Sequence, residues 1–125
     1  MDNSTFESLE KFLIRIPAIR SSIGKGSNKE GYWWVKFEID LGHKYAWNVV
    51  QELAHIMNYP STNEKPPILF YPSSPAPYLN GGPEAYLFWV IESKEISFKP
   101  EILKKLLEEK MPNPVDNLNQ WILDI

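Results

Sequence analysis

The amino-acid sequence predicts an α+β fold: one domain over residues 1–125, built as a two-layer sandwich with helices packed on one face of a small mixed or antiparallel β-sheet. Three observations lead to this prediction. A chain of 125 residues with 43% hydrophobic content is long enough to bury one core. Apolar residues alternate along one stretch and recur at helical spacing along others. The six glycines and 11 prolines fall between these stretches, so the expected order is helix, two strands, helix, two strands, helix, helix.

The chain is expected to begin with a helix and a hairpin. In the stretch STFESLEKFL, Ser4 or Thr5 provides an N-cap, and apolar residues recur at helical spacing up to Leu13. Pro17 should end this helix. Residues 18–41 then read as two arms around a turn rich in Gly, Ser and Asn, which predicts a β-hairpin.

The second arm of this hairpin is the clearest strand in the sequence. Its odd-numbered residues are expected to face the interior: Trp33, Val35, Phe37, Ile39 and Leu41. Its even-numbered residues are expected to face solvent: Trp34, Lys36, Glu38 and Asp40. Only a strand with one solvated face gives this alternation.

The stretch HKYAWNVVQELAHIMNY predicts the next helix, which closes before Pro60. Its apolar stripe is Ala46, Val49, Val50, Leu53 and Met57. A second row, which we expect to pack against an edge strand or a loop, is His43, Trp47, Gln51 and His55. If the strands on either side of this helix pair in parallel, the connection over residues 32–72 is right-handed.

Two strands and two helices complete the prediction. Residues 68–71 read as a short buried strand, and residues 85–93 as a strand buried on both faces, with a helix that begins at Pro83 as the alternative. The next helix starts at Pro100 and stacks on one side Ile102, Leu103, Leu106 and Leu107. A short terminal helix is anchored by Leu118, Trp121 and Ile122.

Composition excludes several classes of protein. With no cysteine, the chain has no disulfide, no thiolate nucleophile and no cysteine-based zinc site. The acidic N-terminus does not resemble a signal peptide, and no run reaches the ~18 apolar residues of a membrane span, so we expect a cytoplasmic protein without membrane contact. The net charge of −3 disfavours nucleic acid as a partner. The alternative of nucleic-acid contact rests on a basic stretch over residues 11–29, with Lys11, Arg15, Arg20, Lys25 and Lys29.

Trp34 is the strongest candidate for a binding residue, because tryptophan on a solvated sheet face is uncommon unless something covers it. The cover is expected to be the chain's own loop over residues 72–84, a second subunit or partner protein, or a small stacked ligand. The proline-rich loop is read first as a stiff corner and second as a recognition element. The predicted binding residues are Trp34, Lys36, Glu38, Asp40, Tyr78, Asn80, Gly81 and Gly82.

Other chemistry is less well supported by the sequence. Glu52 and His55 lie one helical turn apart and form an alternative site, if a pocket lies between their helix and the turn over residues 80–82. His43 and His55 are expected ~18 Å apart along a helix, too far to share a metal ion. The stretch SIGKGSNK lacks the spacing of a phosphate-binding loop and reads as an exposed hairpin turn. We therefore predict no catalytic residue, no metal and no cofactor.

Several blocks of the chain resemble an uncharacterised family of small bacterial cytosolic proteins. They are YWWVKFEID, AWNVVQELAHIMNY and PYLNGGPEAYLFWVIES, followed by a final Pro-Val-Asp and Trp121. The resemblance runs from about residue 32 to the end and implies a bacterial, cytosolic origin, with no activity carried over. The leading hypothesis is a non-catalytic protein-binding module, an adaptor or an immunity-type inhibitor, with a protein partner or a homo-oligomer. The alternative is a small-molecule-binding domain or enzyme.

Overall fold

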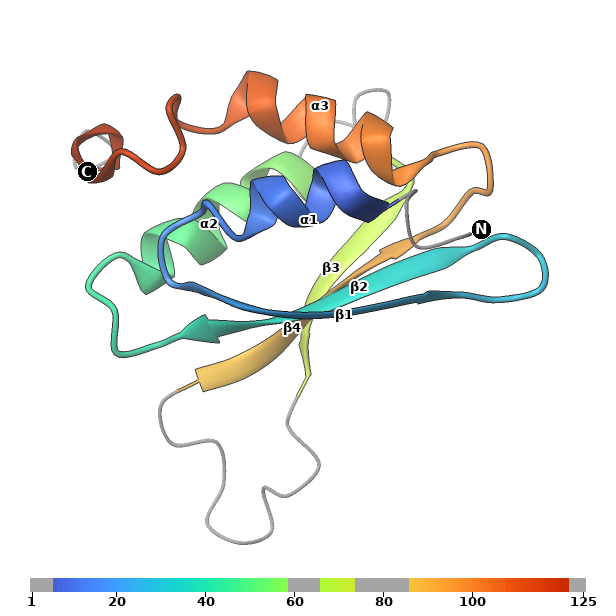
Figure 1. Ribbon diagram of the computed structural model, residues 1–125, viewed down its shortest axis with the longest axis horizontal. Coiled ribbons are helices and arrows are strands. Elements are labelled where there is room, and N and C mark those ends of the chain that lie inside the picture. Colours follow the sequence, from blue (N-terminus) through green and yellow to red (C-terminus); the bar gives the residue numbers. More distant parts are fainter. Residues whose placement is uncertain (1–5, 59–65, 74–85, 122–125) are drawn as a thin grey trace, which may run out of the picture.

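The computed structural model describes residues 6–58, 66–73 and 86–121, and it confirms the α+β class (Figure 1). Each predicted element is present, in the predicted order. The elements are α1 (Glu7–Leu13), β1 (Ile19–Ser27), β2 (Trp33–Asp40), α2 (Ala46–Met57), β3 (Ile68–Ser73), β4 (Tyr86–Ser93), α3 (Pro100–Lys110) and the short 3₁₀ helix η3 (Leu118–Gln120).

The four strands form one sheet in the order β1-β2-β4-β3, and every neighbouring pair is antiparallel. β2 and β3 do not pair, because β4 lies between them. The right-handed connection over residues 32–72 was predicted only for the case in which these two strands pair in parallel. Because they do not pair, that prediction does not apply. The alternative of a helix over residues 85–93 is wrong, since β4 (Tyr86–Ser93) is one of the two inner strands of the sheet.

The three α-helices lie on one face of the sheet, as Figure 1 shows. The alternation of β2 has the predicted phase: Trp33, Val35, Phe37 and Ile39 are buried beneath the helices, whereas Trp34 is 40% exposed on the other face. On β4, Ile91 is buried on the helix side and Val90 is buried on the opposite side, as expected for a central strand. β3 differs from its predicted burial because it is an edge strand, and its Tyr71 is 37% exposed.

The helices bury most of their predicted stripes, but Val50 and Leu106 are only partly buried and Ile102 is exposed. On α2, Val50 is only partly buried and Ile56 joins the core. The row that includes Trp47 and His55 faces solvent, since Trp47 is 54% exposed and His55 is exposed, so the prediction that this row packs against a strand or loop is wrong. These residues lie opposite the buried stripe around the helix axis. On α3, Ile102 is also exposed, because Leu103 and Leu107 already fill the contact with the core.

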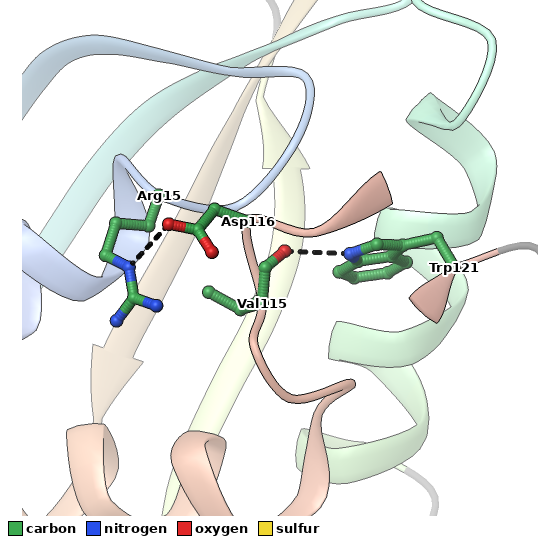
Figure 2. Close-up of polar contacts among 4 residues, drawn as sticks. All are labelled: Arg15, Val115, Asp116 and Trp121. Carbon is green, nitrogen blue, oxygen red and sulfur yellow. Dashed lines mark hydrogen bonds and ion pairs between the residues drawn. The ribbon is translucent and has the colours of Figure 1, made fainter. Parts of the chain in front are cut away.

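The C-terminal segment packs back onto the helices and completes the core (Figure 2). Trp121 is fully buried, and its indole Nε1 donates a hydrogen bond to the carbonyl oxygen of Val115 at 2.9 Å. Arg15, just after α1, pairs with Asp116 at 3.3 Å. Of the three predicted anchors, Trp121 is buried, Leu118 is 43% exposed, and Ile122 lies outside the described residues. Val115, which is buried, anchors the segment together with Trp121.

The N-terminal helix is shorter than predicted. α1 begins after Phe6, which provides no side-chain cap, and ends at Leu13, with turns before Pro17. The expected capping residues Ser4 and Thr5 lie outside the described part of the chain. No helix within that part is long and apolar enough to cross a bilayer.

Candidate functional site: the open face of the sheet

The face of the sheet opposite the helices carries the strongest candidate site, and we call it the open face. The strand register brings even-numbered residues of β2 and β4 beside odd-numbered residues of β3, so that Trp34, Glu92 and Leu69 form one row and Lys36, Val90 and Tyr71 the next. Its members are Arg20, Gly24, Gly26, Trp34, Lys36, Glu38, Asp40, Leu69, Tyr71, Ser73, Phe88, Val90 and Glu92. Four predicted site residues, Trp34, Lys36, Glu38 and Asp40, are therefore brought together.

Trp34 lies over the glycines of β1. A Cβ atom placed on Gly26, its partner across the β1–β2 pair, would lie 2.6 Å from Cζ2 of the indole. A Cβ atom on Gly24 would lie 3.8 Å from Cζ3. One side of the ring therefore covers backbone that glycine leaves bare, and the other side contributes the 40% exposed fraction.

This contact corrects the prediction for the stretch SIGKGSNK. Gly24 and Gly26 are part of β1 rather than of an exposed turn. The turn comes later: Oδ1 of Asn28 accepts hydrogen bonds from the amides of Glu30 and Tyr32, both at 3.0 Å, and Gly31 has a φ of 92°. The glycines of β1 are needed for the approach of Trp34, and no phosphate-binding geometry results.

The charged side chains of the open face interact with partners on the protein itself. Arg20 pairs with Glu38 at 3.4 Å, and the Lys36 ammonium lies 4.7 Å from the centre of the Phe88 ring. Oδ1 of Asp40 accepts a hydrogen bond from the amide of Gly42 at 2.9 Å. Glu38 and Asp40 thus have separate structural contacts, and their arrangement is not that of a catalytic carboxylate pair.

Tyr71 and Glu92 form a further contact across β3 and β4. Burial, followed by the charge and the hydrogen bond of Glu92, raises the pKa of Tyr71 above its ordinary value of 10.0. Glu92 is also the cross-strand neighbour of Trp34. Glu92 therefore interacts with Tyr71 and lies opposite Trp34 in the β2–β4 register.

A pocket of about 350 Å³ opens at the end of the face, beside Trp34 and Glu92. It is lined by Asn28, Tyr32, Glu92, Ser93 and Lys94. Sequence reasoning did not single out these residues, because the pocket depends on the β2–β4 pairing of segments that are far apart in the chain. A second, smaller pocket of about 190 Å³ lies under the C-terminal segment.

The remaining predicted site residues fall outside the open face or outside the part of the chain that the structure describes. Tyr78, Asn80, Gly81 and Gly82 lie outside the described residues. Glu52 is half-buried and His55 exposed on α2, neither lines the two pockets above, and a site that they share with residues 80–82 stays a prediction. His43 precedes α2, contrary to its expected place in that helix, and its Nδ1 accepts a hydrogen bond from the Tyr45 amide at 3.0 Å. Within residues 6–58, 66–73 and 86–121 no three His, Asp or Glu side chains form a metal-binding group.

The basic stretch is largely neutralised by local ion pairs. Lys11 pairs with Glu7 at 2.9 Å, and Lys25 pairs with Glu10 at 2.5 Å. Arg15 and Arg20 have the partners described above. Of the five cations, these pairs involve four, which reduces the positive charge available to a phosphate backbone.

No protein-family model, curated protein or solved structure matches the chain.

Proposed function

We propose that the protein is a non-catalytic protein-binding module, an adaptor or an immunity-type inhibitor of the bacterial cytosol, whose partner docks on the open face. The absence of cysteine from the sequence supports a reducing compartment. The contacts of Glu38 and Asp40 support a binding role over a catalytic one, since both carboxylates already serve the fold.

The observation that carries the proposal is the exposure of two large aromatic side chains on a sheet face that none of the described helices covers. Trp34 is 40% exposed and Tyr71 is 37% exposed, and Val90 and Phe88 lie on β4 between their strands. Tryptophan and tyrosine dominate binding energy at protein interfaces because they offer a large rigid surface with a polar group. The arrangement fits the centre of an interface with charged residues around it.

The open face is small for an interface. Four strands about 4.8 Å apart, each about six paired residues long at 3.3 Å per residue, give a projected area of about 400 Å². A stable complex usually buries about 800 Å² per partner. A partner on the open face is therefore expected to contact adjoining surface as well, such as the edge of β1 or the pocket beside Glu92.

The experiment is a quantitative comparison of proteins captured from a bacterial lysate by the unmodified chain and by three variants. Trp34→Ala and Tyr71→Ala remove the two aromatic side chains of the open face. Trp47→Ala is the matched control, because Trp47 is more exposed, at 54%, but lies on α2. We expect at least one captured protein to fall about tenfold or more with both open-face variants and to persist with Trp47→Ala.

The proposal fails if the captured set is the same for all four proteins. It also fails if Trp47→Ala abolishes capture as strongly as Trp34→Ala does, because the loss then reflects exposed tryptophan in general. Circular dichroism of each variant shows that it is folded before capture.

A further inference from the structure

The two edges of the sheet differ in the backbone groups that they present. In an antiparallel pair, the N–H and C=O groups of one residue point to the same neighbour, and successive residues alternate. The Asn28 amide donates to the carbonyl oxygen of Tyr32 at 2.9 Å, so Gly26 and Gly24, which continue this register, direct their groups to β2. The residues of β1 whose backbone N–H and C=O groups point away from the sheet are Ile23, Lys25 and Ser27.

The edge formed by β3 is closed. The Lys94 amide donates to the carbonyl oxygen of Pro67 at 2.6 Å, and the same alternation leaves Ile68, Phe70 and Pro72 facing outward. The amide of Ile68 donates to the Pro66 carbonyl at 2.8 Å, and the Phe70 carbonyl accepts from Nδ2 of Asn58 at 3.0 Å. Pro72 has no N–H. Each outward residue thus lacks at least one group that an added strand requires.

The edge formed by β1 is open over five residues. A bulge between Ile19 and Ile23 interrupts the ladder at one end, and the turn at Asn28 ends it at the other. Apart from the ladder with β2, no backbone hydrogen bond in the described ranges uses Ile23, Lys25 or Ser27. This edge presents three N–H and three C=O groups in the alternating arrangement that a new strand can pair with.

The side chains beside this edge define what the new strand must carry. On the open face, Gly24 and Gly26 present no side chain, so residues opposite them would fill the space next to the Trp34 indole. Large apolar side chains fit there. On the helix face, the residue opposite Lys25 would meet the ammonium group of Lys25, which pairs with Glu10 at 2.5 Å; the Lys25 side chain as a whole is 26% exposed. An acidic side chain fits this position, because it shares the remaining donors of Lys25.

We propose that β1 takes up an extended segment of the partner protein as a fifth strand, paired with Ile23–Ser27, in which large apolar residues opposite the glycines flank an acid opposite Lys25. This inference rests on the function proposed above and names the kind of partner. Such strand addition gives affinity through the backbone and specificity through alternate side chains. It also supplies the contact area that the open face alone does not offer.

A second copy of the chain is a poorer occupant of the same edge. β1 carries Arg20 and Lys25 and no acid. Symmetric antiparallel pairing centred on Lys25 places two ammonium groups directly opposite one another, which is unfavourable. A charged residue directed inward on an edge strand is a known protection against such self-association.

The test uses a defined probe, the capped peptide acetyl-Thr-Ile-Glu-Ile-Thr-amide, titrated to millimolar concentration into the isotopically labelled protein. We expect the amide resonances of Ile23, Lys25 and Ser27 to shift and their hydrogen exchange to slow, while those of β3 stay unchanged. A peptide with lysine in place of the glutamate should bind at least about tenfold more weakly. A peptide methylated on the glutamate nitrogen should lose binding to the same degree, because one backbone hydrogen bond is removed without any change in the protein.

Variants of the protein provide the second arm. Ser27→Pro removes an outward N–H and leaves the ladder with β2 intact, whereas Ser27→Ala keeps the N–H. We expect the proline variant to bind the glutamate peptide at least about tenfold more weakly and the alanine variant to bind within about twofold of the unmodified protein. Unchanged resonances of the buried Trp121, which lies outside the β1–β2 pair, establish that the proline variant keeps its fold.

Three results overturn the inference: no shift of β1 resonances with the glutamate peptide, equal binding of its methylated analogue, or a dimer in solution that Ser27→Pro dissociates. The last result makes the second copy the occupant. The lysate capture experiment distinguishes failure of strand addition at β1 from failure of the proposed binding on the open face. If Trp34→Ala abolishes capture and Ser27→Pro does not, the open face still binds a partner but strand addition is wrong.

Discussion

The indole of Trp34 covers the backbone of Gly26 so closely that a methyl group at residue 26 would lie 2.6 Å from the ring. The pair joins an edge strand to its neighbour through an aromatic side chain that covers a glycine across the ladder. Trp34 therefore has two roles: its inner side stabilises β1, and its outer side is part of the exposed surface.

Substitution of the two β1 glycines should separate these roles. Gly26→Ala forces the indole to move, and we expect the free energy of unfolding to fall by about 1 to 3 kcal/mol. Gly24→Ala is the matched control, because its methyl group would lie at ordinary contact distance, 3.8 Å, from Trp34. It should change stability by no more than about 0.5 kcal/mol, or raise it slightly by restricting the unfolded chain. Urea unfolding followed by tryptophan fluorescence measures both; equal effects would contradict the close contact at residue 26.

The C-terminal segment should contribute strongly to stability through one side chain. Trp121 is fully buried and donates to the carbonyl of Val115, so Trp121→Ala is expected to lower the free energy of unfolding by about 3 to 5 kcal/mol. Trp121→Phe keeps much of the volume but leaves the carbonyl of Val115 without this donor, and should cost about 1 to 3 kcal/mol. Leu118→Ala, three residues away and 43% exposed in the original, is the control and should change thermal stability little. A similar loss for Leu118→Ala and Trp121→Ala would refute this account of the segment.

Stability should fall at alkaline pH because of Tyr71. Burial and the neighbouring Glu92 raise the pKa of the folded-state phenol above 10.0, its ordinary value. A group whose pKa is raised on folding contributes stability below its unfolded pKa and loses that contribution as the pH rises through the folded pKa. Above pH 10 the free energy of unfolding should therefore decline more steeply for the unmodified protein than for Tyr71→Phe.

Spectroscopic titration can assign this effect. Glu92→Gln removes the charge, the second cause of the shift, and should bring the pKa of Tyr71 closer to 10.0 without restoring it fully, because burial remains. The titration of Tyr71 is obtained as the difference between ultraviolet absorbance curves with and without Tyr71→Phe. An unchanged midpoint in the glutamine variant would show that Glu92 does not act on Tyr71.

Local patterns in the sequence were sufficient to predict the element order and the orientation of β2. The alternation from Trp33 to Ile39 allows only one face of that strand to be buried, and Pro100 marks the start of α3. Each signal comes from residues near one another in the chain. The same is true of Trp34, whose unusual place on a solvated face was visible from parity alone.

Relationships between distant segments were not predictable in this way. Gly24 and Gly26 were interpreted as turn residues, because glycine often marks turns, whereas their function depends on an indole from the neighbouring strand. Helical spacing led us to predict packing contacts for Ile102 and Trp47. Other residues of α3 and α2 already fill the interior, so both side chains are exposed. The pocket beside Glu92 and the closed edge of β3 depend on strand order, which periodicity does not specify.

The position of β4 at the centre of the sheet has a consequence for synthesis of the protein on the ribosome. Of the four strands that the structure describes, β4 is translated last, yet it is the strand that joins β2 to β3. A nascent chain that ends before Tyr86 holds the β1–β2 hairpin and a separate β3 segment with no partner strand between them. We therefore expect the sheet to assemble only after Tyr86–Ser93 has been made, with the apolar side of β2 in need of protection until then.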